Sequence, residues 1–161
     1  MALAVGSKVP AITLKSKTAD GLIDVALTRN VGKGQTVLLF VPLAFTGVCT
    51  EELCSISKSI HAYNSLNADV IAVSVDSPFA QEAWAQKEGI SFALASDFNR
   101  EAVRAYEVCD EDFLTGVLGY KGVAKRSAFV IGADGVIKYA WSSEDPKNMP
   151  PFEEIQAALK A

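Results

Sequence analysis

Two short apolar runs restrict most strongly what this chain can fold into. Thr36–Pro42 and Ala68–Val75 are rich in β-branched and other apolar side chains, and they lack the polar alternation of a half-exposed strand. Such runs are typical of strands that are covered on both faces. Between them, residues 49–66 repeat apolar side chains at helical spacing without an internal Pro or Gly. This order predicts a β-α-β unit at the centre of a sheet.

The rest of the chain adds helices and hairpins to this unit. Ser77-Pro78 resembles a helix N-cap followed by a first-turn proline, and Gly89 stands where that helix would end. Residues 127–132 and 136–142 flank an Asp-Gly turn signal, which predicts an antiparallel hairpin. Further expected elements are a strand at 90–94, a helix at 100–107, an irregular stretch at 110–123, a closing helix after Pro150-Pro151, and a peripheral hairpin of strands 10–14 and 22–27. This order predicts an α/β fold, a thioredoxin-like sandwich with a central mixed sheet, an N-terminal hairpin addition and flanking helices.

Length and charge exclude several broad classes of protein. With 161 residues the chain is expected to form a single domain, residues 1–161. Its 15 basic against 19 acidic side chains, without a basic cluster, disfavour nucleic-acid binding. The run Val37–Phe45 is interrupted by Pro42 and is far shorter than the roughly 20 residues that cross a membrane. The first 20 residues lack the apolar stretch of a signal peptide, so we expect a cytoplasmic protein with no membrane partner.

The three cysteines, Cys49, Cys54 and Cys109, indicate thiol chemistry. An odd number in a chain that can build its own core makes a disulfide framework a poor explanation. Cys49 is expected in the first turn of a helix, where free N–H groups and the helix dipole favour a thiolate. Thr46 can place a hydroxyl beside this sulfur, and Pro42 stiffens the loop. The simpler alternative is that Cys49 fills a gap in the core.

The spacing Pro42-x-x-x-Thr46-x-x-Cys49 resembles the active-site signature of the peroxiredoxins, and the resemblance extends over nearly the whole chain. Arg126, just before the apolar run 128–131, is similar to the arginine that this family supplies from a strand. The resemblance implies a peroxidase that works without metal, haem or flavin. In such an enzyme Cys49 would attack hydrogen peroxide or an organic hydroperoxide and become a sulfenic acid.

The same resemblance implies a role for the neighbours of Cys49. Arg126 would hold the sulfur as a thiolate and donate hydrogen bonds to the peroxide, and Thr46 would orient the substrate. Backbone N–H groups at Val48 and Cys49 would complete the donor set, and Glu52 would hold the arginine. For an isolated arginine, a surface salt bridge would be the simpler explanation.

Cys54 follows Cys49 at the spacing C-x-x-x-x-C, which resembles the bacterioferritin-comigratory, or Q-type, subgroup and implies that Cys54 is the resolving thiol. Five residues of α-helix separate two Cα atoms by roughly 8 to 9 Å. A disulfide spans only about 4.4 to 6.8 Å. We therefore expect two separate thiols on a folded helix in the reduced protein, and local unfolding when the disulfide forms. The alternative is a one-cysteine enzyme that uses an external thiol.

The same resemblance bears on the partners of the protein, and the remaining Cys and His residues have simpler interpretations. The resemblance implies thioredoxin or a similar dithiol as reductant, and the sequence is compatible with a monomer or a homodimer. Cys109 is interpreted as structural, although a role as a resolving or intersubunit thiol stays open. His61 is the only histidine, so neither a zinc site nor a Cys-His dyad is expected.

Two other classes of function compete with this interpretation. A thiol-disulfide oxidoreductase would need C-x-x-C at the helix start, which the sequence lacks. A redox-sensing or binding domain, in which Cys49 is oxidised only slowly, stays open as an alternative.

Overall fold

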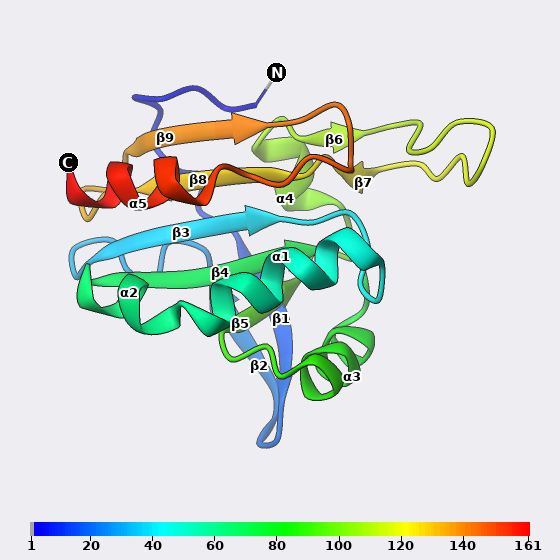
Figure 1. The fold of residues 1–161 in the computed structure, drawn as a ribbon, viewed down its shortest axis with the longest axis horizontal. Helices are drawn as coiled ribbons and strands as arrows, with labels where there is room; N and C mark the ends of the chain where they lie inside the picture. The colour runs from blue at the N-terminus through cyan, green and yellow to red at the C-terminus, as the bar shows by residue number, and fades with distance from the viewer. Residues whose placement is uncertain (1) are drawn as a thin grey trace.

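The computed structural model describes residues 2–161, and its main element is a seven-stranded mixed sheet (Figure 1). The strands are β1 (Thr13–Thr18), β2 (Gly21–Ala26), β3 (Gln35–Phe40), β4 (Ala68–Ser74), β5 (Ala93–Ser96), β8 (Ser127–Ile131) and β9 (Ile137–Ser142), in the spatial order β2-β1-β5-β4-β3-β8-β9. β3 is parallel to β4 and antiparallel to β8, and β4 is parallel to β5. The expected mixed α/β sheet is therefore confirmed.

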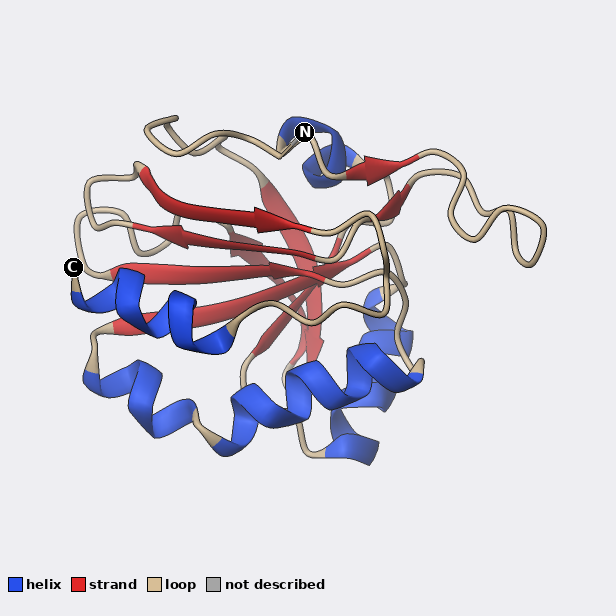
Figure 2. Ribbon diagram, turned by 45° about the horizontal axis from the view of Figure 1, so that its top comes forward, coloured by secondary structure: helices blue, strands red, loops and turns tan. Residues whose placement is uncertain are grey.

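Helices cover both faces of this sheet. The helices are α1 (Gly47–Lys58), α2 (Ile60–Ser65), α3 (Pro78–Glu88), α4 (Glu101–Ala105) and α5 (Phe152–Lys160). Figures 1 and 2 show α1, α2 and α5 together on one side of the sheet and α4 on the other. A two-stranded antiparallel ribbon of β6 (Cys109–Asp110) and β7 (Val123–Ala124) lies on the α4 side.

The apolar run of β3 supplies both hydrophobic cores, because successive side chains of a strand point to opposite faces. Leu38 and Phe40 pack in the core that contains α4, whereas Val37 and Leu39 pack in the core beneath α1, α2 and α5. All four side chains are fully buried. This two-sided burial explains why the run shows no polar alternation.

The local signals for α3 and for the last hairpin are confirmed in detail. The Ser77 hydroxyl accepts a hydrogen bond from the N–H of Ala80 at 3.2 Å, and Pro78 is the first residue of α3. Gly89 ends the helix with a φ of 69°, a left-handed conformation that costs glycine little. β8 and β9 pair antiparallel as expected.

Two element boundaries differ from the expectation. The single helix expected over 49–66 is interrupted at Ser59, which separates α1 from α2. β5 begins at Ala93 rather than at residue 90, because Ile90–Phe92 connect the left-handed end of α3 to the sheet. Apolar periodicity locates an element but does not define its first residue.

The N-terminal hairpin lies at the edge of the main sheet, as expected, but its first strand covers Thr13–Thr18 rather than residues 10–14. β1 runs to Thr18 and pairs with β2 from Gly21, and Lys15 pairs with Ser96 of β5. Apolar patterning did not locate the second half of β1 because its residues are polar, although Ser16 is buried and the strand is paired on both sides. The hairpin therefore extends the main sheet at the β5 side.

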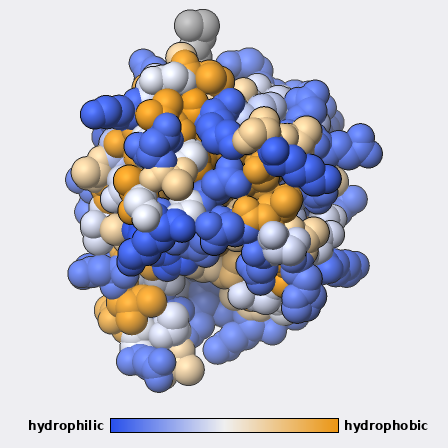
Figure 3. Space-filling view, turned by 90° about the vertical axis from the view of Figure 1, so that its left-hand side faces the viewer, coloured by the Kyte–Doolittle hydropathy of each residue, from blue (hydrophilic) through white to orange (hydrophobic). Residues whose placement is uncertain are grey.

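Among residues 2–161, no helix has the length and apolar character needed to cross a bilayer. The end of the molecule opposite the β3–α1 loop faces the viewer in Figure 3, where apolar groups are scattered among polar ones.

Candidate active site

The candidate site lies where β3 ends and α1 begins. Residues 41–46 connect the two elements, so Cys49 is the third residue of α1, and it is 1% exposed. Helical bonding starts with the N–H of Thr50, which donates to the carbonyl of Thr46 at 3.0 Å. The preceding amides of the first turn have no acceptor within the helix. Together with the helix dipole, they make this turn favourable for an anion.

Strand register brings Arg126 to Cys49 across 77 positions of the chain. Arg126 directly precedes β8, whose first residue, Ser127, pairs with Phe40 at the end of β3. The arginine side chain is 2% exposed. Its Nη2 donates to the Sγ of Cys49 at 3.3 Å, and its Nε donates to the carbonyl of Pro146 at 3.0 Å. The hydrogen bond to Pro146 therefore helps to hold the guanidinium beside the sulfur.

Glu52 provides the third contact of Arg126. Residues three apart are neighbours on a helix, so Glu52 lies on the same face of α1 as Cys49. Its Oε2 accepts from Nη1 of Arg126 at 2.6 Å, while its buried Oε1 has no hydrogen-bond partner among residues 2–161. Burial raises the pKa of Glu52 to about 7, although the charge and hydrogen bond of Arg126 oppose this shift.

The charge of Arg126 is itself supported by its partners. Burial lowers the pKa of the guanidinium, but the nearby Cys49 and Glu52 outweigh burial, and the net shift is upward. The three groups therefore form one buried electrostatic unit with a permanent cation at its centre.

The loop before α1 is held by polar contacts on both of its sides. The hydroxyl of Thr46 donates to the carbonyl of Leu43 at 2.7 Å. Asp76, which follows β4, accepts from the N–H of Ala44 at 2.8 Å. Phe45 has a φ of 66°, a left-handed conformation that is uncommon for a bulky residue. These contacts place Thr46 at the start of the helix.

α3 supports the first turn of α1 from the side. Nε1 of Trp84 donates to the hydroxyl of Thr50 at 3.0 Å, and Trp84 is 1% exposed. The ring of Phe45 lies 6.4 Å from the Trp84 ring, and Nζ of Lys87 lies 6.0 Å from the Phe45 centroid. Sequence reasoning missed this support because the two hydrogen-bonded residues lie 34 positions apart on separate helices.

A pocket of about 200 Å³ opens at Cys49. Thr46, Cys49, Arg126 and Lys147 bring polar side chains to it, and Pro42 lines it as well. Its apolar wall includes Phe113, Leu114 and Leu118 from the connection between β6 and β7. The sequence predicts this connection only as an irregular stretch, residues 110–123. Adjacent apolar residues within this glycine-bearing loop were the only signal in the sequence that the loop contacts another part of the protein.

The structure brings Pro42, Thr46, Val48, Cys49, Glu52 and Arg126 together, but not the other two cysteines. All three thiols are free. Cys54 donates to the carbonyl of Glu88 at 3.6 Å, and Cys109 lies 3.2 Å from the carboxylate of Glu111. Burial, followed by the contact with Glu111, raises the pKa of Cys109 to about 11. The expected arrangement of two separate thiols on a folded α1 is present.

His61 and the acidic side chains do not form a metal centre in the described part of the chain. His61 is exposed on α2. Within residues 2–161, no three His, Cys, Asp or Glu side chains are arranged to hold a metal ion.

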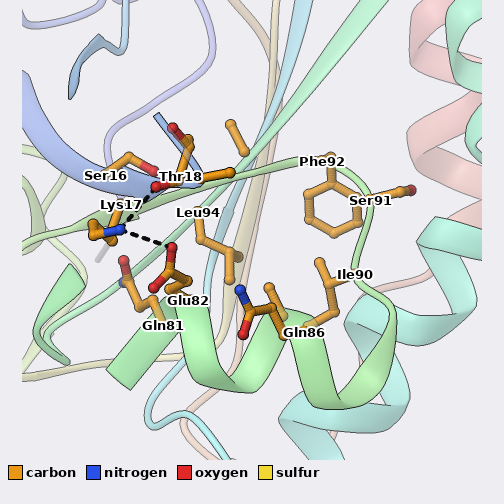
Figure 4. Close-up of a pocket in the computed structure, with 13 residues that line it drawn as sticks. Ser16, Lys17, Thr18, Gln81, Glu82, Gln86, Ile90, Ser91, Phe92 and Leu94 are labelled. Atoms are coloured by element: carbon orange, nitrogen blue, oxygen red, sulfur yellow. Dashed lines mark hydrogen bonds and ion pairs between the residues drawn. The ribbon is translucent and has the colours of Figure 1, made fainter. Parts of the chain in front are cut away.

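A second pocket of about 240 Å³ lies between β1, α3 and the segment before β5 (Figure 4). On one side, Nζ of Lys17 donates to the carboxylate of Glu82 at 3.1 Å and to the carbonyl of Thr18 at 2.8 Å. On the other side, Figure 4 shows the apolar side chains of Ile90 and Phe92. No cysteine lines this pocket, so a thiol nucleophile is available only at the Cys49 pocket of these two.

The chain is similar in sequence to known proteins. Residues 5–140 match the model of the AhpC/TSA family. The chain is 33% identical over 147 residues to the chloroplastic 2-cysteine peroxiredoxin of Chattonella marina var. antiqua, covering 87% of this chain and 71% of that protein. It spans about half the length of some longer chloroplastic relatives.

Two solved structures show the same fold. The reduced 2-Cys peroxiredoxin of Plasmodium vivax has a TM-score of 0.84 and 25% identity, over 98% of this chain and 80% of that one. Peroxiredoxin Q of Xanthomonas campestris has a TM-score of 0.77 and 25% identity, over 92% of this chain and 89% of that one. Both 2-Cys and Q-type peroxiredoxins are among the similar proteins. The chain belongs to the AhpC/TSA family and is a peroxiredoxin, a thiol-dependent peroxidase.

Proposed function

We propose that Cys49 is the peroxidatic cysteine and that Arg126, Thr46 and the N–H groups of Val48 and Cys49 form the peroxide site. The observation that carries this proposal is the buried contact of 3.3 Å between Nη2 of Arg126 and the Cys49 sulfur. A guanidinium donates several hydrogen bonds in fixed directions. It can therefore stabilise the thiolate and still donate to an incoming peroxide.

In the first step the Cys49 thiolate attacks the terminal oxygen of a hydroperoxide, ROOH. An S–O bond forms, the O–O bond breaks, and the leaving oxygen takes the electron pair and a proton to depart as ROH. The sulfur is oxidised by two electrons to a sulfenic acid, and the peroxide is reduced. Arg126 and the first-turn N–H groups stabilise the negative charge that develops on the leaving oxygen.

Cys54 is proposed to resolve the sulfenic acid, as in the Q-type subgroup. Its thiol attacks the Cys49 sulfur, water is released, and an intramolecular disulfide forms. Thioredoxin or a similar dithiol then reduces this disulfide and becomes oxidised. Because a regular helix holds the two sulfurs too far apart, the first turns of α1 must unwind. The hydrogen bond from Cys54 to Glu88 must also break.

A one-cysteine cycle with an external thiol is the second candidate. It is favoured by the same contact between Cys54 and Glu88, which directs the Cys54 thiol toward α3 in the folded helix. Either cycle needs a compartment that keeps thiols reduced, so we propose the cytoplasm. Either cycle also operates in a monomer or a homodimer, because Cys49 and Cys54 belong to the same chain.

Stopped-flow measurement of the reduced protein with hydrogen peroxide tests the nucleophile. The tryptophan fluorescence of the wild type should change far faster than a free thiol is oxidised, and Cys49→Ser should abolish the change. Cys109→Ser is the matched control and should leave the rate unchanged, because the raised pKa of Cys109 keeps that thiol protonated at neutral pH. Oxidation of Cys49 no faster than a free thiol would favour the redox-sensing alternative.

Peptide mapping after one equivalent of peroxide tests the resolving step. A Cys49–Cys54 crosslink supports the two-cysteine cycle. A stable sulfenic acid on Cys49 with Cys54 unmodified would instead establish the one-cysteine cycle.

A further inference from the structure

We propose that Gln81, a buried residue of α3, is a positioning residue for the peroxide site. It orients Asp76 through Ser74, and Asp76 holds the loop that carries Thr46. The inference rests on the proposed function, because it adds a residue to the site built around Cys49. Gln81 lines the second pocket (Figure 4) and not the Cys49 pocket, so it acts only through its neighbours.

A chain of hydrogen bonds connects Gln81 to the loop before α1. Nε2 of Gln81 donates to the hydroxyl of Ser74 at 2.9 Å. The Ser74 hydroxyl donates to Oδ2 of Asp76 at 2.7 Å, and the same Oδ2 accepts from the N–H of Ala44 at 2.8 Å. Gln81 and Ser74 are 2% and 1% exposed, so water does not compete for their hydrogen bonds.

The chemistry of the side chains fixes the direction of each of these bonds. Nε2 of Gln81 carries two hydrogens, and it also donates to the carbonyl of Ala95 at 2.9 Å. Rotating the amide by half a turn would bring Oε1 against this carbonyl, where neither oxygen has a hydrogen to donate. The Ser74 oxygen accepts from Gln81, so its single hydrogen is available for Asp76. The amide of Gln81 therefore makes Ser74 a donor to the carboxylate.

Asp76 is held through its backbone as well as through its carboxylate. The hydroxyl of Ser96 donates to the carbonyl of Asp76 at 2.6 Å. Ala44, which donates to the carboxylate, directly precedes Phe45, whose φ of 66° is uncommon for a bulky residue. Thr46 follows as the N-cap residue of α1. A fixed Asp76 therefore holds the turn that sets the position of the Thr46 hydroxyl.

The amide of Gln81 is not the side chain that would stabilise this buried position best. Its Oε1 has no hydrogen-bond partner among residues 2–161, and a buried polar atom without a partner costs free energy. An apolar side chain of similar size would avoid this cost. The unpaired oxygen accompanies a donor whose effect is to orient Ser74 and Asp76.

Second-order rate constants for oxidation of the reduced protein by hydrogen peroxide test the proposal. Competition with a haem peroxidase for the peroxide measures them without tryptophan fluorescence, which a change near Trp84 could alter. Gln81→Met keeps the size of the side chain and removes both donors, and Ser74→Ala removes only a hydroxyl. Each should lower the rate constant about tenfold, because a small misplacement of Thr46 weakens its contact with the peroxide. Asp76→Asn keeps an oxygen that accepts both bonds and should retain most of the rate.

A double-mutant cycle with Thr46→Val separates positioning from a merely structural role. If Gln81 acts through the loop, adding Gln81→Met to Thr46→Val should lower the rate constant less than about twofold further. Gln86→Met is the matched control, because Gln86 is exposed on the same helix and undergoes the same chemical change. This control should leave the rate constant unchanged.

Two results would overturn the proposal while the role of Cys49 stands. One is a rate constant within about twofold of the wild type in both Gln81→Met and Ser74→Ala. The other is an equal loss from Gln81→Met with and without the Thr46 hydroxyl, because Gln81 would then act only on the fold. A wild type that is oxidised no faster than a free thiol is a different result. It would overturn the role of Cys49, and the positioning role of Gln81 with it.

Discussion

The guanidinium of Arg126 donates to the sulfur of Cys49 at 3.3 Å and to the carboxylate of Glu52 at 2.6 Å, so one cation serves two groups of the same helix face. Its third donor bonds the carbonyl of Pro146 at 3.0 Å. The planar guanidinium donates to three acceptors in three directions, which the ammonium group of a flexible lysine side chain cannot do. The site therefore depends on the shape of this cation as well as on its charge.

Arg126→Lys should accordingly lower the rate constant for Cys49 oxidation by about 100-fold, because the thiolate and the leaving oxygen lose directed donors. Stopped-flow fluorescence with hydrogen peroxide measures this rate. Lys125→Gln is the neighbouring control, since Lys125 pairs with Glu144 at the surface and should be replaceable without effect. A rate for Arg126→Lys within about twofold of the wild type would exclude a catalytic role for the planar guanidinium.

Thr46 is expected to contribute a hydrogen bond to the bound peroxide. Its hydroxyl donates to the carbonyl of Leu43 at 2.7 Å, so its oxygen keeps lone pairs that can accept from a hydroperoxide proton. Thr46→Val should lower the rate constant for Cys49 oxidation about ten- to hundredfold. Thr46→Ser keeps the hydroxyl and should retain most of the rate. Equal losses in both variants would mean that the methyl group, and not the hydroxyl, matters.

Glu52 should make folding stability depend on pH. Burial raises its pKa to about 7, above the ordinary glutamate value of 4.5 that applies to the unfolded chain. The folded state therefore binds a proton more readily than the unfolded state between these values. The resulting stabilisation is complete below about pH 4.5 and is lost as the pH rises through about 7.

Urea denaturation of the wild type and of Glu52→Gln at pH 5 and pH 8 measures this effect. The glutamine cannot ionise, so only the wild type should lose free energy of unfolding from this source between the two pH values. The expected difference is about 3 kcal/mol or less. An identical pH dependence of the two proteins would show that Glu52 does not titrate in this range.

Trp84 should restrain the unfolding of α1 that the proposed disulfide requires. Its hydrogen bond to Thr50 at 3.0 Å ties the first turn of α1 to α3. Trp84→Phe removes the bond, which contributes about 1 kcal/mol, and should speed formation of the Cys49–Cys54 disulfide about fivefold. Quenched peptide mapping over time measures the disulfide directly. Trp141→Phe is the control, and a slower reaction in Trp84→Phe would contradict the restraint.

The local features of this protein could be predicted from sequence because neighbours in the chain determine them. The caps of α3 at Ser77 and Gly89 depend on hydrogen bonds and backbone angles within a few residues. The β8–β9 hairpin follows from strand patterns on either side of a short turn. The break at Ser59 and the start of β5 at Ala93 were not predicted, because packing against the sheet selects such boundaries.

The site could be predicted only in part. The motif of Pro42, Thr46 and Cys49 lies within eight residues, and Glu52 follows one helical turn after Cys49, so their proximity is a property of local structure. The hydrogen bond from Trp84, the carbonyl of Pro146 and the wall of Leu114 and Leu118 come from distant segments. No pattern within a short stretch of sequence indicates that these groups contact the site.

By itself the sequence determined the strands, the helix that carries Cys49 in its first turn and the residues able to perform thiol chemistry, because periodicity, caps and side-chain chemistry act over short distances. Tertiary structure alone decided that the residue preceding β8 meets the end of β3, and thus that a buried arginine contacts the sulfur. It also decided that the connection between β6 and β7 closes one side of the pocket. The physical reason is that strand register and side-chain packing join segments far apart in the chain, and their free energy depends on the whole folded core.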